Sequence, residues 1–139
     1  MNSAKDLLKR ELKLKLPKGK SAFLWGARKT GRAFEHFIFQ ELSAHRSYSE
    51  LNYSISYYRT KTGMEVDFIL GNGEIAIEIK GGTEIRSQDL KSLESFQEEF
   101  SPKKSILVSN EKLSRKSGKI EIIPYRIFLE LLWNGKIIN

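Results

Sequence analysis

Residues 65–80 read EVDFILGNGEIAIEIK, and this stretch decides the fold. A two-residue turn at Asn72-Gly73 between two apolar segments is typical of a type I′ β-hairpin, in which both turn positions need positive φ. That turn places Asp67 opposite Glu78. Slipping the pairing by one residue would exchange the two faces of each strand, so the hydrophobic pattern itself selects this register.

The predicted hairpin has one polar face, because opposed residues share a face and so do residues two apart along a strand. Glu65 lies opposite Lys80 on this face, where an ordinary cross-strand ion pair is expected and Glu65 needs no role as a metal ligand. Asp67 and Glu78 differ, because like charges about 4.5–5.5 Å apart between Cβ atoms destabilise a sheet. The other face carries only apolar side chains: Val66, Phe68, Leu70, Ile75, Ile77 and Ile79.

A divalent cation between Asp67 and Glu78 would turn their repulsion into attraction. Mg²⁺ favours one or two carboxylates completed by water and substrate phosphate oxygens. Lys80, beside the pair, would then orient or deprotonate a water, or stabilise charge that develops on a phosphate. The alternative is a solvated acidic patch whose repulsion is tolerated. The residues of the hairpin by themselves leave both interpretations open.

Apolar periodicity extends the fold on both sides of the hairpin. Helices are expected over residues 32–45, 87–100 and 125–133, and strands over 54–59, 65–70, 74–80, 105–109 and 120–123. Nearer the N-terminus, the pattern indicates a short helix over 4–11 and short strands over 12–16 and 21–25. This order predicts an α/β fold with a central mixed β-sheet flanked by helices.

The chain has 139 residues, 24 Lys+Arg and 17 Asp+Glu, for a formal net charge of +7. The whole excess lies in a basic N-terminal segment, residues 1–30, while the remaining domain, 31–139, has no net charge. Within that domain, residues 103–119 form a second basic cluster that Ser114, Ser117 and Gly118 mark in part as a loop. Such segments either contact phosphates or form solvated surfaces.

Several classes of protein are excluded at this point. The chain has no cysteine, which excludes disulfides and thiolate chemistry and fits a reducing compartment such as the cytoplasm. No apolar run approaches the roughly 18 residues of a membrane-spanning helix, so no membrane partner is expected. A soluble cytoplasmic protein of one compact domain is therefore the expectation.

The set Asp67 and Glu78-Ile79-Lys80, preceded by a helix that bears Glu35, resembles the PD-(D/E)XK nuclease superfamily, with Val66 in place of the proline. The resemblance implies a restriction-endonuclease-like fold with an α-β-β-β-α-β core. It implies that Asp67 and Glu78 bind Mg²⁺ or Mn²⁺, and that Glu35 and Lys80 complete the catalytic set. The implied activity is hydrolysis of phosphodiester bonds in DNA, and the resolvase-like members of the superfamily further imply a homodimer that acts on branched or duplex DNA.

A closer resemblance covers roughly residues 31–133. The segments GRAFE at 31–35, YR at 58–59, GMEVDF at 63–68, EIK at 78–80 and DL at 89–90 look like the resolvase-like C-terminal module of predicted AAA-type ATPases. Residues 24–31, LWGARKTG, resemble the start of such an ATPase up to its phosphate loop, as though the ATPase core were deleted. A working loop continues Gly-Lys-Ser/Thr. Here Arg32-Ala33 follow, so ATP is not an expected ligand. The resemblance also leaves an alternative function: an idle nuclease-fold remnant that binds nucleic acid or a protein.

Six basic side chains are candidates for contacts to nucleic acid: Arg59, Lys61, Lys103, Lys104, Arg115 and Lys116. Three tyrosines, Tyr53, Tyr57 and Tyr58, either stack on bases or pack in the sheet, and packing is the commoner role of strand aromatics. His36 and His45 lie about two and a half turns apart on one predicted helix, so they do not form a chelating pair. Surface or capping roles are expected for both histidines.

Overall fold

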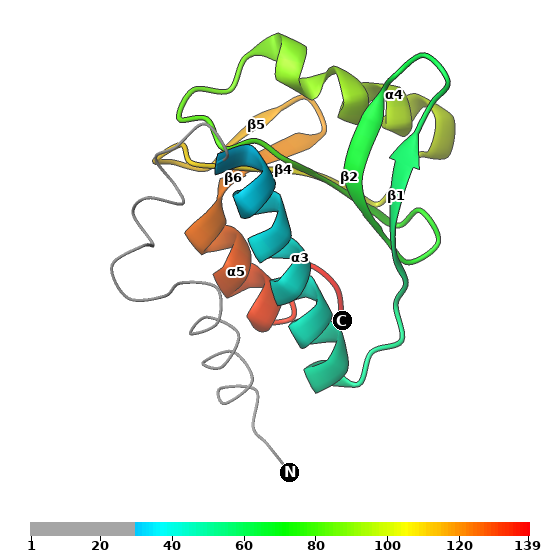
Figure 1. Ribbon diagram of the computed structural model, residues 1–139, viewed down its shortest axis with the longest axis vertical. Coiled ribbons are helices and arrows are strands. Elements are labelled where there is room, and N and C mark those ends of the chain that lie inside the picture. Colours follow the sequence, from blue (N-terminus) through cyan, green and yellow to red (C-terminus); the bar gives the residue numbers. More distant parts are fainter. Residues whose placement is uncertain (1–29) are drawn as a thin grey trace. The chain divides into compact units, whose positions relative to one another are not determined.

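The computed structural model describes residues 30–139 (Figure 1). The predicted helix over 4–11, the strands over 12–16 and 21–25 and residues 24–29 of the phosphate-loop remnant lie outside the described residues. The described chain divides into two compact units. One is Tyr53–Phe128, and the other joins residues 30–52 to Leu129–Asn139. None of the helices within residues 30–139 is long and apolar enough to span a membrane.

The first unit contains a six-stranded mixed sheet in the order β1-β2-β3-β4-β6-β5. Strands β1, β2 and β3 form an antiparallel meander, β4 and β6 continue in parallel, and β5 closes the edge antiparallel to β6. The strands are β1 Ile55–Arg59, β2 Glu65–Leu70, β3 Ile75–Ile79, β4 Lys104–Ser109, β5 Arg115–Ser117 and β6 Ile120–Pro124. With the three α-helices of residues 30–139, the fold is α/β, as predicted.

A helical crossover joins β3 to β4 and covers one face of the sheet, as a parallel connection requires. It begins as the 3₁₀ helix η1, Ser87–Leu90, and continues as α4, Lys91–Phe100, where the sequence predicts one helix (Figure 1). Ser101 adopts φ +48° and donates its N–H to the carbonyl of Gln97 over 3.0 Å, which ends α4. The apolar stripe of η1 and α4 packs against sheet residues in one buried cluster: Val66, Ile69, Ala76, Ile85, Leu90, Leu93, Phe96, Leu107, Ile120 and Ile122.

The register of the β2–β3 hairpin is the predicted one, with Phe68 opposite Ile77 and Leu70 opposite Ile75. The predicted type I′ turn is wrong, because the positive φ values fall on Gly71 (+69°) and Gly73 (+74°), not on Asn72. Neighbouring segments hold this tip. Gly71 donates its N–H to the Ser54 carbonyl over 2.9 Å, and the Glu74 carbonyl accepts the N–H of Lys103 over 2.8 Å. The backbone conformation of the turn is therefore fixed by hydrogen bonds to neighbouring segments as well as by its own residues.

Strand β2 contains a β-bulge at Asp67. Ser56 of β1 faces Ile69 and Tyr58 faces Val66, so two β2 residues, Asp67 and Phe68, face the single residue Tyr57. A bulge breaks strict alternation and redirects side chains. Val66 accordingly joins Ile69 and Ala76 in the buried cluster under α4, contrary to the prediction that Val66 shares a face with Phe68 and Ile77. The bulge thus sets the direction of the Asp67 side chain.

The second unit contains α3, Thr30–Ser49, and the C-terminal part of α5, Tyr125–Trp133, which begins in the first unit. The predicted apolar stripe of α3 is buried: Phe34, Phe37, Ile38 and Leu42. The helix ends where Glu50 adopts φ +59°. His45 is 4% exposed and its ring meets Trp133 edge-on at 5.2 Å, so the predicted surface or capping role is wrong for His45. Burial lowers the pKa of His45.

Candidate active site

Asp67 and Glu78 face each other at the point where the β2–β3 ladder stops. The backbone N–H of Asp67 donates to Glu78 Oε1 over 3.1 Å, and the backbone N–H of Ile79 donates to Asp67 Oδ2 over 2.7 Å. Each carboxyl group thus accepts a main-chain hydrogen bond from the other strand. This exchange holds both side chains in place and brings the predicted pair together.

Glu78 is 5% exposed, whereas Asp67 is half-buried. Loss of solvation and the adjacent Asp67 carboxyl raise the pKa of Glu78 to about 9. The positive charge of Lys80 lowers the pKa of Glu78, but this effect is smaller than the increase that burial causes. Without a cation, this raised pKa favours the protonated form of Glu78, which relieves the repulsion that two carboxylates would suffer.

Lys80 directly follows β3 and reaches the same site. Its backbone N–H donates to the Val108 carbonyl of β4 over 2.9 Å, which fixes the residue where β3 leaves the sheet. Its Nζ lies 3.7 Å from Glu78 Oε2, and 40% of its side chain is exposed. The ammonium group is therefore held beside the acids and stays open to a ligand from solvent.

Two predicted acidic residues stand apart from this pair. Glu65 pairs with Arg59 across β1 and β2, with Arg59 Nε 2.8 Å from Glu65 Oε1, so the predicted Glu65–Lys80 pair is wrong. The edge strand β1 provided a nearer cation than β3. Glu35 is half-buried on α3, in the second unit, and its role in the metal site stays a prediction.

The residues present fit a hard divalent cation. One oxygen of each acid, Asp67 Oδ2 and Glu78 Oε1, accepts a backbone N–H. The second oxygens accept no backbone N–H, and Glu78 Oε2 lies 3.7 Å from Lys80 Nζ, a contact that a metal ligand would share with the lysine. Within residues 53–128, no third Asp, Glu or His side chain joins the pair in a metal-binding cluster. Mg²⁺ needs only one or two carboxylates, because water and substrate phosphates complete its coordination. The donor set therefore fits Mg²⁺ or Mn²⁺ better than a metal that needs a full protein cage.

The six residues predicted to contact nucleic acid differ in their surroundings: some are paired within the fold, one is exposed, and three line a pocket. Arg115 is committed to the fold, since its Nε and Nη2 donate to Glu111 over 3.0 Å each and Nη2 also donates to the Ile85 carbonyl over 2.9 Å. It begins strand β5, in a stretch interpreted in part as a loop from its serines and glycine. Arg59 is paired with Glu65 and Lys61 is exposed. The other three line one pocket: Lys103, Lys104 and Lys116.

The three tyrosines also differ in their surroundings. Tyr53 is buried, and Tyr58 packs edge-on against Phe96 while its hydroxyl donates to Glu99 over 2.7 Å, so packing is confirmed for both. Tyr57, opposite the bulge, is 72% exposed, which the packing interpretation did not predict. His36 is exposed, as predicted. No pattern in the sequence indicated the bulge or the exposure of Tyr57.

Comparison with known protein families finds a family model that matches most of the chain. The model of DUF4143, a domain of unknown function, matches residues 30–128, which is more than half of the chain. No curated protein matches the chain, and no solved structure does. The matched stretch contains α3, all six strands and α4, and with them Asp67, Glu78 and Lys80. The chain therefore belongs to the DUF4143 family.

Proposed function

We propose that this protein is a metal-dependent nuclease of the PD-(D/E)XK type that hydrolyses phosphodiester bonds in DNA. The observation that carries the proposal is the placement of Asp67, Glu78 and Lys80 together at the end of one hairpin. A buried acid with a strongly raised pKa, next to a second acid and a lysine, is typical of a functional site rather than of a solvated patch.

The topology supports the same proposal. The chain order is α3, the meander β1-β2-β3, the crossover helix α4 and the parallel strand β4. This is the α-β-β-β-α-β order that the resemblance to restriction-endonuclease-like nucleases implies. The acids lie on β2 and β3 of the meander, where the resemblance expects them. Fold alone does not specify a reaction, so the proposal depends on the site.

The residues of the chain would divide the chemistry as follows. Asp67 and Glu78 would hold the cation through the oxygens that accept no backbone N–H, and Glu78 would release its proton as the cation binds. A Mg²⁺ held there would polarise a phosphate oxygen and lower the pKa of a bound water, which favours its loss of a proton to give the attacking hydroxide. Lys80, partly exposed beside Glu78, would stabilise negative charge on the phosphate or hold the attacking water.

A cleavage assay tests the proposal. Supercoiled, linear and four-way-junction DNA are incubated with the full chain and Mg²⁺ or Mn²⁺. We expect cleavage of at least one substrate, lowered by about 100-fold or more in Asp67→Asn and in Lys80→Ala. Glu65→Gln is the matched control, because Glu65 lies on the same strand as Asp67 but pairs with Arg59.

Two results would contradict the proposal. One is the absence of cleavage of every substrate under both metals, and the other is cleavage that the Asp67 and Lys80 variants retain in full. Either would favour the alternative, a nuclease-fold module that binds nucleic acid or a protein without hydrolysis. Sedimentation of the same samples tests the homodimer that the resemblance to resolvases implies.

A further inference from the structure

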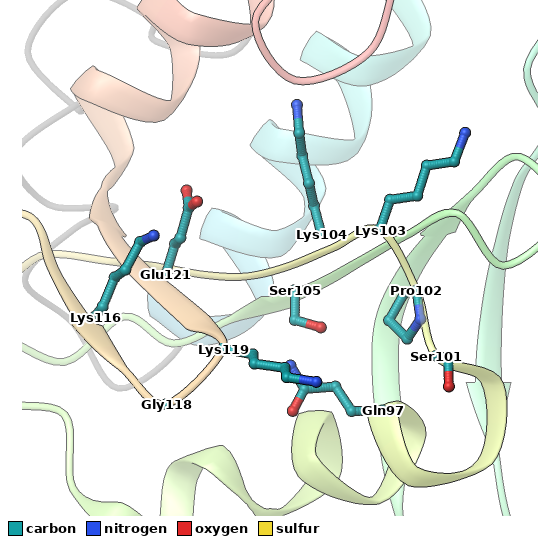
Figure 2. Close-up of a pocket in the computed structure, with 10 residues that line it drawn as sticks. All are labelled: Gln97, Ser101, Pro102, Lys103, Lys104, Ser105, Lys116, Gly118, Lys119 and Glu121. Carbon is teal, nitrogen blue, oxygen red and sulfur yellow. The ribbon is translucent and has the colours of Figure 1, made fainter.

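A second site lies away from the acidic pair, where β4 begins. The start of β4, the β5–β6 turn at Gly118 and the last turn of α4 surround a pocket of about 390 Å³. Neither Asp67, Glu78 nor Lys80 lines it. Its volume is in the range of small-molecule sites. Figure 2 shows its lining side chains, which come from α4, β4, β5, β6 and the segments that join them, all in the same unit.

Ser105 forms the buried part of this pocket. The residue is 3% exposed, and its Oγ has no hydrogen-bond partner among the described residues. A buried hydroxyl without a partner costs free energy, and native proteins rarely leave one so. In Figure 2 the Ser105 hydroxyl points into the space above Lys119 and Gln97. An incoming ligand would supply the missing acceptor.

Lys119 and Gln97 supply further donors. In Figure 2 the Lys119 side chain extends towards the Gln97 amide, below the Ser105 hydroxyl. Lys119 follows Gly118 in the β5–β6 turn, is exposed, and forms no ion pair with any residue from 30 to 139. An ammonium, an amide and a hydroxyl therefore converge on one space, a combination that suits an oxyanion.

The charges around the pocket favour an anion. Four of the ten lining residues are lysines, against the single acid Glu121. Lys116 faces Glu121 across β5 and β6, which offsets the acid. Lys103 and Lys104 direct their ammonium groups away from Ser105, and Lys103 Nζ lies 3.4 Å from Glu74. These lysines raise the potential at the rim, and Lys119 is the one that Figure 2 shows extending below the Ser105 hydroxyl.

One structural role competes for Lys119. The last turn of α4 exposes backbone carbonyls, and a helix C-terminus attracts cations. Ser101 N–H satisfies the Gln97 carbonyl, which reduces that demand. A helix-capping lysine would also leave the Ser105 hydroxyl without a partner. The two roles of Lys119 can be told apart by measurement. A capping role predicts that loss of Lys119 lowers the stability of the protein, whereas a ligand-binding role predicts that it weakens binding.

We propose that this pocket binds a phosphate monoester through Ser105 Oγ, the Gln97 amide and Lys119 Nζ. A monoester presents three terminal oxygens and up to two charges, which matches three donors. A backbone diester is flanked by sugar on both sides and reaches a buried hydroxyl less easily. The monoester belongs either to a phosphorylated strand end or to a small phosphorylated molecule. The site needs neither the metal nor the proposed nuclease activity.

Binding to the full chain in metal-free buffer tests this proposal. The probes are inorganic phosphate and two fluorescent oligonucleotides of one sequence, with a 5′-phosphate or a 5′-hydroxyl. We expect saturable phosphate binding that falls about tenfold or more in Lys119→Ala and Ser105→Ala. Lys112→Ala is the charge-matched control, since Lys112 is exposed and lies outside the pocket. Asp67→Asn separates this site from the proposed active site and leaves phosphate binding unchanged.

The arms distinguish the two sources. Tighter binding of the 5′-phosphorylated strand, lost in both pocket variants, identifies a strand end. Binding of inorganic phosphate with equal affinity for the two strands identifies a small phosphorylated molecule. The proposal is overturned if phosphate does not bind, if Lys112→Ala weakens binding as much as Lys119→Ala, or if the pocket variants bind normally. A lower Tm of Lys119→Ala with normal phosphate binding would identify a helix cap instead.

Discussion

The backbone N–H of Asp67 donates a hydrogen bond to the carboxyl group of Glu78 over 3.1 Å, at the end of the β2–β3 ladder. The return bond runs from Ile79 N–H to Asp67 over 2.7 Å. Side-chain oxygens thus take the place of carbonyls where the strands separate. These two bonds hold the acids side by side although Glu78 is only 5% exposed, and the proposed cation would bind between them.

The first prediction concerns pH. The pKa of Glu78 is 4.5 ordinarily and about 9 in the folded protein, so between these values the folded state binds the extra proton. The stabilisation is complete below about pH 4.5 and is lost as the pH rises through about 9. The free energy of unfolding should fall by at most about 1.4 kcal/mol per pH unit in that window. Urea denaturation of metal-free protein between about pH 5.5 and 8.5 measures this slope.

Glu78→Gln is the informative variant for that slope. A glutamine keeps an oxygen for the Asp67 N–H but does not titrate, so the difference in stability from the unmodified protein should grow in its favour as the pH rises. Comparison at each pH cancels the contributions of other groups, including His45, whose pKa burial lowers. Glu65→Gln, at an exposed position, should show no such trend. Parallel pH profiles of Glu78→Gln and the unmodified protein would refute the assignment.

The second prediction concerns the hairpin tip. Gly71 and Gly73 both have φ near +70°, and alanine at either should cost about 1 kcal/mol of unfolding free energy. A Cβ at Gly71 would also lie 2.9 Å from Glu74 Oε1, whereas one at Gly73 would meet nothing within 4 Å. The Glu74 carboxylate is the far end of an exposed, flexible side chain and can turn away, so the two variants should cost about the same. A much larger loss in Gly71→Ala, removed by Glu74→Ala, would show instead that the Glu74 side chain is held in place.

The third prediction concerns Arg115. Its bonds to Glu111 and to the Ile85 carbonyl join β5 to the segment after β3, so Arg115→Ala should lower the unfolding free energy by about 1 kcal/mol, given its partial exposure. The loss of DNA affinity should equal that of Lys112→Ala, which removes one charge without a structural bond. Unchanged stability with a larger loss of affinity would instead make Arg115 a DNA contact.

The sequence predicted the central hairpin well because its information is local. Alternation from Val66 to Ile79 allows one register, and that register already places Asp67 opposite Glu78. Strand β2 and helix α5 have the predicted bounds, since each is strongly apolar with clear breaks at its ends. A match between local pattern and tertiary structure of this kind needs no knowledge of distant residues.

The errors all depend on partners distant in sequence. The turn conformation at Gly71 depends on the hydrogen bond from its N–H to the Ser54 carbonyl. The bulge at Asp67 depends on the pairing of β2 with β1. Strand β5 is short and polar, so only its pairing with β6 defines it. Burial of His45 against Trp133 joins residues at opposite ends of the fold's sequence. Ser105 gave no signal, because a serine in an apolar strand reads as a tolerated small residue until its surroundings are known.

Calorimetric titration of the full chain with Mn²⁺ tests the central claim most directly, because it measures the metal site without any assumption about the DNA substrate. We expect one saturable Mn²⁺ site that releases protons on binding near neutral pH, since Glu78 must ionise. Asp67→Asn and Glu78→Gln should abolish this site, and Glu65→Gln should retain it. An unmodified protein that binds no Mn²⁺, or an Asp67→Asn variant that binds it equally well, would contradict the account.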